Sequence, residues 1–412
     1  MFIRLFLKEC KQILSGMTYY IVVICIVFFY ITQLGNFNIL QKPLPGKPEY
    51  GTMYSKDEAV IMDETIKLLF QEYVYNNYAT YPIGFYKSVV LNEKKKDQMA
   101  EILMEVAGFT KAELNQAVEK HSSNMTAYDK STLGDIKATP DLTYERFLEL
   151  MRKADKLLGG GSSYNDSSLT TNARVPMSYE DALKEYNNIM EKDHLTGAYA
   201  RLFSDYIGIV LAILPIFIAV TRGLRDKRAK AKEIIYSRQV SSSYIILTRY
   251  LALLTMVLLP VIIIAAIPAT QCIYYGITEG ISVDYFGFAK YIFGWLLPTL
   301  MIVTSLGIFF TELTDSAIAI ILQGLWWFIS IFSGVVSIRG GYGWNLVPRH
   351  NELGNYEVFH ENFGILAANR ITYSVAAILL IAASIWVYEM KRKGKLNIHG
   401  TISPNRKSKS EV

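Results

Sequence analysis

The chain has 412 residues, of which 51% are apolar and only 19% are charged, and its mean hydropathy is +0.21. Soluble proteins carry roughly 25% charged residues, so this composition argues against a purely soluble globular protein and against a disordered chain. The net charge of +5 is too small to indicate nucleic acid, and the three widely spaced cysteines rule out a disulfide scaffold and a cysteine zinc site. We therefore expect a protein that resides in a lipid bilayer and has no nucleic-acid partner.

Residues 1–16 form an amphipathic stretch ahead of the first apolar segment. Apolar positions share one face of a helix, and the other face carries Arg4 and Lys8, with Glu9 beside them. Such a helix lies along the membrane surface and turns into the span that follows, so we interpret it as an elbow helix. A simple basic anchor for a retained first span is the alternative.

Six segments are long enough and apolar enough to cross a bilayer, which takes roughly 20 residues of helix. Their backbones must satisfy their own hydrogen bonds in lipid, so each is expected to be a helix. They cover residues 17–34, 201–222, 244–275, 287–311, 317–338 and 371–390. Pro260, Pro268 and Pro298 fall inside these spans, where we expect local kinks or unwinding. The predicted fold is an all-α polytopic membrane protein with six transmembrane helices.

Residues 35–200 separate the first two spans and suffice for one folded domain. They hold 19 basic and 24 acidic residues, so they are acidic while the rest of the chain is basic. Capping-box patterns at Thr110 and Ser178 predict helix starts, and Gly159-Gly160-Gly161 predicts the end of a helix over 142–158. A mobile polar loop is expected at 160–172. We predict a large, mainly helical extracellular domain.

Lysine and arginine gather before residue 17, in and around segment 223–243, and in the tail 391–412. These segments lie on one side of a membrane only if there are six spans. Because short cytoplasmic loops are rich in basic residues, we predict a multi-pass protein of the cell membrane with both termini in the cytoplasm. The acidic turn with Glu312 and Asp315 is the exception, although acidic residues weigh little in this rule.

Motifs for catalysis are absent from the sequence. It contains no GxxxxGK[ST] loop, no HExxH and no GxSxG pattern, and its histidines are scattered outside the spans at His121, His194, His350, His360 and His399. We therefore predict no catalytic, cofactor-binding or metal site in this chain, and no ATP hydrolysis of its own.

Polar residues inside the predicted spans are few, which argues against an ion-coupled transporter. Asp205 lies near the outer end of span 201–222, where solvation by water or headgroups is the simpler interpretation. Gln323 lies in the middle of span 317–338 beside Trp326 and Trp327, where hydrogen bonding and packing between helices would explain it. The alternative places these four residues on a translocation path.

The segment Lys232-Glu-Ile-Ile-Tyr-Ser-Arg-Gln-Val-Ser241 resembles the cytoplasmic stretch between the second and third spans of ABC-2 type permeases, the membrane subunits of type V ABC exporters. The N-terminal Leu5-Phe-Leu-Lys8-Glu9 run, followed by Ile13-Leu14, is similar to the elbow helix of that family. The six spans and the large segment between the first two also fit, so the resemblance covers essentially the whole chain.

The resemblance implies a separate ABC ATPase subunit, which would bind ATP and magnesium, and a second permease copy or paralogue. Residues 226–240 would contain the coupling helix that rests on the ATPase, and segment 339–370 would include a re-entrant element on the outer side. The residues expected to couple to the ATPase are Lys230, Glu233, Ile234, Ile235 and Arg238. The implied function is ATP-driven export of an amphipathic or peptide-like solute, or resistance to one.

Other interpretations stay open at this point. A membrane sensor or assembly protein would bind a ligand or protein through its extracellular domain and signal inward through residues 226–240. Segment 226–240 is alternatively a solvated basic loop that touches anionic lipid. A secondary transporter is disfavoured by the scarcity of buried charge.

Overall fold

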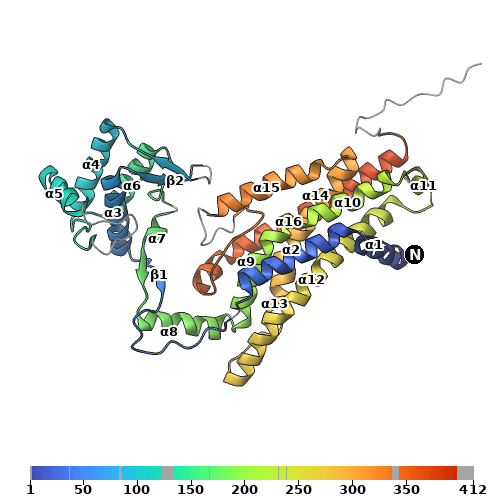
Figure 1. The fold of residues 1–412 in the computed structure, drawn as a ribbon, viewed down its shortest axis with the longest axis horizontal. Coiled ribbons are helices and arrows are strands. Elements are labelled where there is room, and N and C mark those ends of the chain that lie inside the picture. The colour runs from blue at the N-terminus through green and yellow to red at the C-terminus, as the bar shows by residue number, and fades with distance from the viewer. Residues whose placement is uncertain are drawn as a thin grey trace, which may run out of the picture. The chain divides into compact units, whose positions relative to one another are not determined.

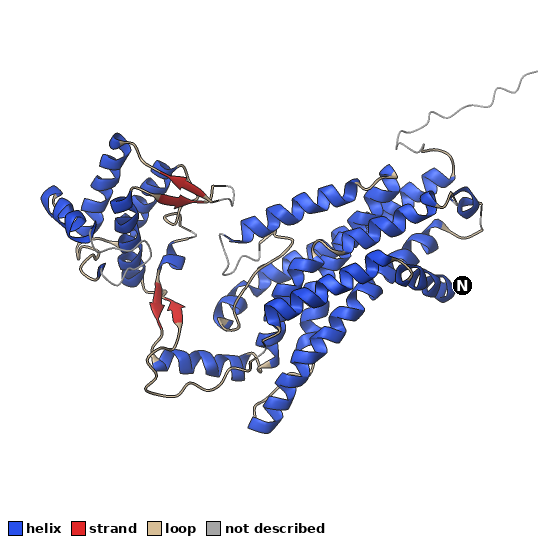
Figure 2. Ribbon diagram, in the orientation of Figure 1, coloured by secondary structure: helices blue, strands red, loops and turns tan. Residues whose placement is uncertain are grey.

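The computed structural model describes residues 2–36, 38–82, 86–122, 133–166, 168–230, 232–237, 239–335 and 343–396, with the backbone alone at 232–233 and 333–335. Most of these residues are helical, and the strands are short (Figure 2). The chain divides into two compact units. One is centred on residues 42–184, and the other is built from the apolar segments before and after it.

The apolar unit is a bundle of long helices (Figure 1). Among the described residues, four stretches are long and apolar enough to cross a membrane, and a bent pair of helices makes a fifth when it is counted as one span. The four are α2 (Met17–Leu34), α12 (Ser242–Glu279), the α13-to-α14 stretch (Gly287–Thr314) and α16 (Tyr356–Arg392), and the bent pair is α9 (Thr196–Leu211) with α10 (Pro215–Arg228). Within its described side chains, α15 (Ile318–Val335) adds a shorter apolar stretch, Ile318–Phe332. The chain is thus a mostly helical polytopic membrane protein, and its sixth span stays a prediction.

Helix α12 begins with a side-chain cap. The side chain of Ser241 caps the helix by accepting a hydrogen bond from the Tyr244 amide at 3.3 Å. The helix then continues without interruption through Pro260 and Pro268. Unwinding at these prolines is therefore not observed, because neighbouring groups in a membrane bundle can compensate for the lost backbone hydrogen bond. The kinks that the sequence predicts as the alternative stay a prediction.

The predicted span 287–311 consists of three helical pieces. These are α13 (Gly287–Tyr291), a π-helical turn η3 (Ile292–Leu296) and α14 (Leu297–Thr314). Pro298 lies in the first turn of α14, where its missing N–H has little cost. The local change of winding expected at this proline is the π-helical turn that precedes it.

Two glycines allow α10 and α14 to pack closely. A Cβ atom at Gly223 would lie 2.7 Å from Thr311 Cγ2, and a Cβ atom at Gly307 would lie 2.7 Å from Ala219 Cβ. Small residues at such contacts let helix backbones approach each other in a membrane. The two glycines therefore fix the distance between these helices.

The last long helix begins earlier than the sequence predicts. Segment 339–370 was expected to be a loop or re-entrant element ahead of a span at 371–390, but α16 is continuous from Tyr356 to Arg392. Its first turns are polar, so hydropathy did not reveal them. The first residues of segment 339–370 lie outside the described residues, which resume at Gly343.

Arg370 ties the segment before α16 to the bundle. This side chain is almost fully buried, and its Nη1 donates to Trp295 O at 3.1 Å and to Thr299 Oγ1 at 2.6 Å. Its Nη2 lies 3.4 Å from the carbonyl oxygens of Asn345 and Leu346. A buried guanidinium is tolerated here because backbone and side-chain oxygens satisfy its donors.

The second unit, residues 42–184, is mainly helical and has its own apolar core. Fully buried members of this core include Ile66, Leu69, Phe70, Leu103 and Phe147. Its helices are α3 (Glu58–Tyr75), α4 (Glu93–Ala107), α5 (Lys111–Ser122), α6 (Tyr144–Leu158), α7 (Leu169–Asn172) and most of α8 (Tyr179–Asn187). Two small antiparallel sheets pair β1 (Thr52–Tyr54) with β4 (Arg174–Pro176), and β2 (Tyr78–Thr80) with β3 (Lys87–Val89).

The helix ends predicted in this unit are confirmed. The Thr110 amide donates to Glu113 Oε2 at 2.7 Å, and the Ser178 amide donates to Asp181 Oδ2 at 3.1 Å, which are the reciprocal bonds of capping boxes. Helix α6 ends at Gly159, whose φ of +97° lies in the left-handed region that glycine adopts easily.

The segment 160–172, predicted to be a mobile polar loop, contains helix α7 at its end and is hydrogen-bonded in its described part, while its mobility stays a prediction. Ser162 Oγ donates to Asp155 Oδ1 at 2.7 Å, and Asn172 Nδ2 donates to Ser163 O at 2.8 Å. The hydroxyl of the buried Tyr164 donates to the Glu72 carboxylate. Burial and the Glu72 charge raise the pKa of Tyr164 well above its usual value of 10, so it stays a neutral donor.

Candidate functional site

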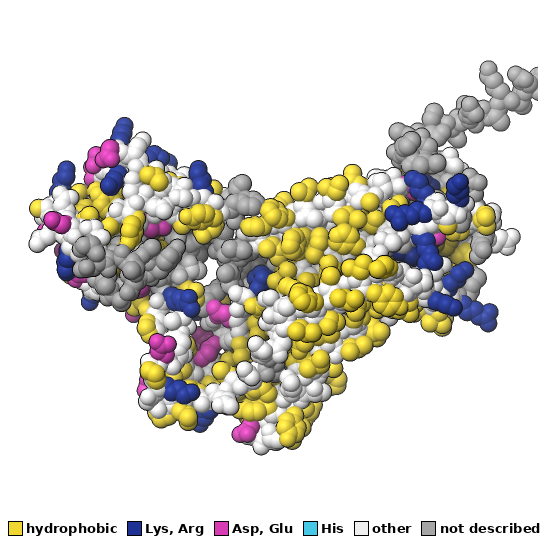
Figure 3. Space-filling model, in the orientation of Figure 1, with side chains coloured by type: hydrophobic (Ala, Val, Ile, Leu, Met, Phe, Trp, Pro, Cys, Tyr) yellow, Lys and Arg dark blue, Asp and Glu magenta, His cyan; other side chains and the backbone are white. Residues whose placement is uncertain are grey.

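Many of the basic side chains of the bundle gather at one end. Figure 3 shows lysine and arginine gathered at the end that holds α1 (Phe2–Leu14) and α11 (Lys232–Tyr236), while hydrophobic side chains cover its length. Beneath this basic surface lies a buried group of charged residues, which we call the ionic cluster. Its members are Glu9 on α1, Arg222 and Asp226 on α10, Arg249 on α12 and Glu312 on α14.

A bidentate ion pair joins α1 to α10. Glu9 accepts from Arg222 Nε at 2.6 Å and from Arg222 Nη2 at 2.7 Å. The same guanidinium reaches Asp226 Oδ1 one turn further along α10, at 3.3 Å from Nη1. This bidentate geometry is the strongest form of arginine–carboxylate contact.

Arg249 extends the cluster to two more helices. Its Nη2 bonds to the Asp226 carboxylate, its Nη1 lies 3.3 Å from Glu312 Oε1, and its Nε lies 3.7 Å from Glu9 Oε1. One guanidinium therefore contacts carboxylates from α1, α10 and α14.

The ionic cluster is shielded from solvent. The side chains of Glu9, Arg222, Arg249 and Glu312 are 5–7% exposed, and that of Asp226 is 14% exposed. The cluster holds three carboxylates against two guanidiniums. Loss of either arginine would leave buried negative charge without compensation, which costs far more than an intact pair gains. The cluster thus opposes separation of these helix ends.

A second ion pair brings α16 to the same end. Lys391 Nζ lies 2.9 Å from Asp315 Oδ2 and also donates to the Glu312 carbonyl oxygen. Lys227 Nζ donates to the Asp315 carbonyl oxygen at 3.1 Å. The acidic turn that was an exception to the charge rule therefore consists of buried partners for basic residues.

Helix α11 is shorter than the helix that the sequence predicted over 226–240. Helix α10 runs to Arg228, and the chain then turns at Lys230, which is exposed and has a φ of +53°. Only Lys232–Tyr236 form α11. A left-handed residue between the two helices explains the interruption.

The predicted coupling residues have different surroundings. Ile234 is 63% exposed, whereas Ile235 is partly buried against the core of the bundle. The side chain of Glu233 and the whole of Arg238 lie outside the described residues. Among the predicted coupling residues with a described side chain, Ile234 and Lys230 are thus the exposed ones.

Helix α11 is attached to α16. Arg392 Nε donates to Tyr236 O at 3.0 Å, and Arg392 Nη1 donates to Val240 O at 2.6 Å. The rings of Tyr236 and Tyr388 meet edge to face with centroids 5.2 Å apart. Helix α11 therefore contacts α16 directly, and Lys391 of α16 bonds to the end of α14.

The three elbow residues separate into two kinds. Arg4 and Lys8 are exposed, as the amphipathic pattern predicts, but Glu9 is buried in the ionic cluster. Sequence reasoning treated Arg222 and Arg249 only as basic flanking residues and missed Asp226 and Glu312 as partners. Single acidic residues at the ends of apolar spans with basic flanks are the signal that could have found them.

The break between α9 and α10 leaves backbone carbonyls that account for the hydrogen bonds of Gln323 and Trp327, two of the candidate path residues. Pro215 has no N–H, and the backbone hydrogen bonding already departs from that of an α-helix in the residues before it. The Ile213 amide bonds to Val210 O at 3.2 Å, and the Ile216 amide bonds to Ile213 O at 3.4 Å. Both bonds span three residues instead of four, so the carbonyl one residue earlier loses its helical donor in each case.

Side chains of α15 bond to the two carbonyls. Trp327 Nε1 donates to Ile209 O at 2.9 Å, and Gln323 Nε2 donates to Ala212 O at 2.6 Å. These are the hydrogen bonds between helices that the sequence suggested as one interpretation of Gln323. The two side chains fasten α15 to the bend.

Asp205 and Trp326, the other two candidate path residues, also have partners inside the bundle. Asp205 is fully buried, lies 2.8 Å from Arg349 Nε and accepts from the Asn351 amide at 2.6 Å. Solvation at the membrane surface is therefore not its role. The ring of Trp326 packs against that of Tyr373, with centroids 5.7 Å apart.

A second buried ion pair lies where α9 begins. Arg201 is 0% exposed, and its Nη1 and Nη2 donate to the two oxygens of Asp193 at 2.9 and 2.8 Å. Arg201 Nη2 also donates to Leu353 O at 2.8 Å, and its guanidinium lies 4.8 Å from the Phe359 ring centroid. Buried charge is thus more frequent than the apolar segments suggested. It is ion-paired here, whereas the buried Arg370 bonds to uncharged oxygens.

No protein-family model, curated protein or solved structure matches the chain. Within the described ranges, no group of three or more histidine, cysteine, aspartate or glutamate side chains is placed to hold a metal ion. The functional argument therefore rests on the geometry of the bundle.

Proposed function

We propose that the chain is the permease subunit of an ATP-binding-cassette exporter of the ABC-2 type. In this proposal α15 completes six transmembrane helices, both termini are cytoplasmic, and residues 35–200 lie outside the cell. The basic end of the bundle supports this orientation, because lysine and arginine beside a span favour the cytoplasm.

The ionic cluster is the observation that carries the proposal. It joins the elbow helix α1 to α10, α12 and α14 at the basic end, and Arg392 joins α11 to α16 there. A push on α11 or α1 would move these helix ends together, since separating them exposes buried charge to an apolar surrounding. Such a block suits a subunit that is moved by a partner rather than by its own chemistry.

The partners follow from the same proposal. A separate ATPase subunit would bind ATP and magnesium and rest against α11. A second permease copy or a paralogue would complete the complex, and the solute would be amphipathic or peptide-like. Exposed apolar side chains along α2, including Tyr20, Ile24 and Phe28, suit contact with lipid or with that second copy.

Coupling through α11 is tested by the I234S variant. Ile234 is exposed, so the exchange leaves the bundle intact, but it removes an apolar contact from the proposed docking helix. Because central interface residues contribute about 2 kcal/mol or more, we expect ATP turnover of the co-purified complex in liposomes to fall at least tenfold. The I277S variant is the matched control, because Ile277 is also 63% exposed and lies outside α11. Unchanged turnover in I234S would refute the coupling role.

Orientation is tested by labelling cysteines in a variant that lacks Cys10, Cys25 and Cys272. Leu44 is 62% exposed in the second unit, and Lys230 is exposed beside α11. We expect a membrane-impermeant maleimide to label L44C in intact cells and K230C only after lysis. The reverse pattern would overturn the proposed topology.

A membrane sensor or assembly protein is the second candidate, because residues 42–184 have a complete core of their own. An ATPase that co-purifies with the chain and responds to I234S favours the exporter. Ligand-dependent protection of the second unit in the full chain, with no ATPase present, favours the sensor.

A further inference from the structure

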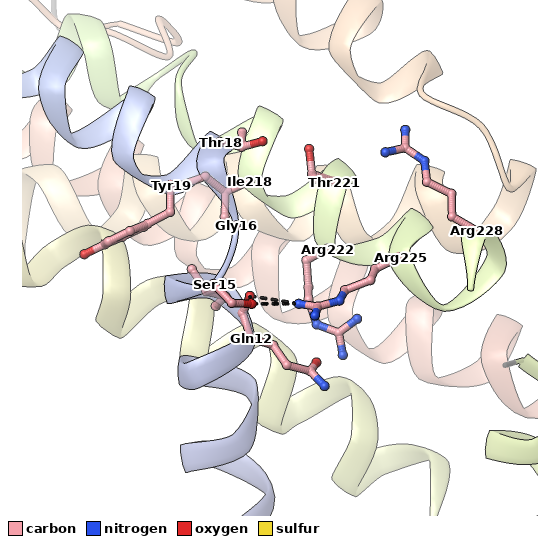
Figure 4. A pocket seen from close by; sticks show the side chains of 11 residues that line it. Gln12, Ser15, Gly16, Thr18, Tyr19, Ile218, Thr221, Arg222, Arg225 and Arg228 are labelled. Carbon is pink, nitrogen blue, oxygen red and sulfur yellow. Dashed lines mark hydrogen bonds between the residues drawn. The ribbon is translucent and has the colours of Figure 1, made fainter. Parts of the chain in front are cut away.

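A pocket lies where α1, α2 and α10 meet, next to the ionic cluster (Figure 4). It encloses about 230 Å³. Its polar lining includes Arg225, Arg228, Ser15, Thr18 and Thr221, and its apolar lining includes Ile13, Tyr19 and Ile218. The pocket is therefore amphipathic, with cationic groups on one part and apolar side chains on another.

The arginines of this pocket differ in whether a carboxylate neutralises their charge. Arg222 belongs to the ionic cluster, whereas Arg225 Nη1 donates to two uncharged oxygens, Gln12 O at 3.0 Å and Ser15 Oγ at 3.2 Å. Figure 4 shows Arg225 directed toward Ser15 and Gln12. In the part of the chain that the structure describes, neither Arg225 nor Arg228 forms an ion pair. Two guanidiniums thus bring uncompensated positive charge to one pocket.

The donors around the pocket suit a phosphate group. Arginine presents planar N–H groups that match phosphate oxygens, and the Thr18 and Thr221 hydroxyls add two further donors. Helix α2 begins here at Gly16, which offers no side chain to cap the first amides. The positive end of the helix dipole therefore adds to the charge of the arginines.

The apolar surroundings indicate that this phosphate belongs to a lipid. Ile13, Tyr19 and Ile218 line the pocket beside its arginines and hydroxyls. An acyl chain can contact these side chains while the headgroup meets the cationic part of the pocket. An acidic peptide would meet the arginines but would leave the apolar lining without an apolar partner.

We propose that this pocket binds the phosphate of an anionic phospholipid from the leaflet at the basic end of the bundle. Basic pockets between helices on the cytoplasmic side of a membrane bind such headgroups. The lipid would bridge the elbow helix, the first span and α10, and so stabilise the angle between α1 and α2. The proposal requires the bundle to lie in a membrane, and it holds whether or not the partner is an ATPase.

The test compares the full-length wild type with R225Q/R228Q by native mass spectrometry in detergent containing phosphatidylglycerol or phosphatidylcholine. We expect the wild type to retain one phosphatidylglycerol in preference to phosphatidylcholine. At about 1 kcal/mol for each basic residue, the double variant should bind it roughly thirtyfold more weakly. The R228Q variant should show part of this loss with an unchanged fold, since Arg228 is exposed and has no ion pair in the described structure.

Controls distinguish lipid binding in the pocket from non-specific attraction of the lipid to basic residues and from binding of other anions. The variant K11Q/K395Q removes two exposed charges outside the pocket and should bind phosphatidylglycerol within twofold of the wild type. An equal loss in this control, or undiminished binding in R225Q/R228Q, would overturn the proposal. Displacement of the lipid by equimolar inorganic phosphate, or by an acidic peptide, would also overturn it, because the site would then not recognise a lipid.

Discussion

Replacing Arg249 with methionine is expected to destabilise the helical bundle by about 3–5 kcal/mol. Arg249 contacts the carboxylates of Asp226, Glu312 and Glu9, and methionine would leave three buried carboxylates with Arg222 alone. The measurement is the equilibrium unfolding free energy of the purified chain in mixed micelles. The same variant should also lose partner-stimulated ATP turnover if the cluster transmits force.

A matched control and a rescue make this prediction specific. Arg4 is an exposed arginine on the elbow helix, so R4M should change stability by less than about 0.5 kcal/mol. The double variant R249M/E312Q removes one of the stranded charges and should recover part of the loss. Equal stability of R249M and R4M would show that the cluster does not hold the helices together.

Replacing Arg201, near the N-terminal end of α9, with methionine is expected to lower the free energy of unfolding by about 3–5 kcal/mol as well. The change removes a bidentate partner from Asp193, whose side chain is 4% exposed, and leaves the Leu353 carbonyl without this donor. The loss should appear in the unfolding free energy, and protection from proteolysis should decrease around residues 353–354.

The Arg201 prediction has its own comparison. Arg152 also pairs with an aspartate, Asp166, but both side chains are more than half exposed, so R152M should cost no more than about 1 kcal/mol. Neutralising the stranded carboxylate in R201M/D193N should restore part of the stability. If R201M and R152M lose the same amount, burial does not govern the effect.

Local patterns in the sequence predicted local structure well. The Thr110 and Ser178 boxes and the stop at Gly159 depend on residues within a few positions of each other, and the structure confirms them. Hydropathy also located the long apolar helices. It did not locate the start of α16, because the polar turns that begin at Tyr356 resemble a loop in composition.

Contacts between distant segments could not be predicted in the same way. Glu9 and Arg222 are 213 positions apart, and nothing local indicates that one is the partner of the other. Pro215 and Gln323 are also far apart, yet the altered backbone before Pro215 is what gives Gln323 its acceptor. Charge and polarity were visible in the sequence, but the pairing depends on how the helices are assembled.

The bend between α9 and α10 restricts how α15 can move. Its two donors lie one helical turn apart and meet two carbonyls at 2.6 and 2.9 Å. A shift of α15 along its axis by one residue, about 1.5 Å, would carry both donors out of register at once. Of the possible rotations of α15, only one about the line through the two contacts would preserve both bonds. Sliding of α15 past the bend of its neighbour therefore breaks both hydrogen bonds at once.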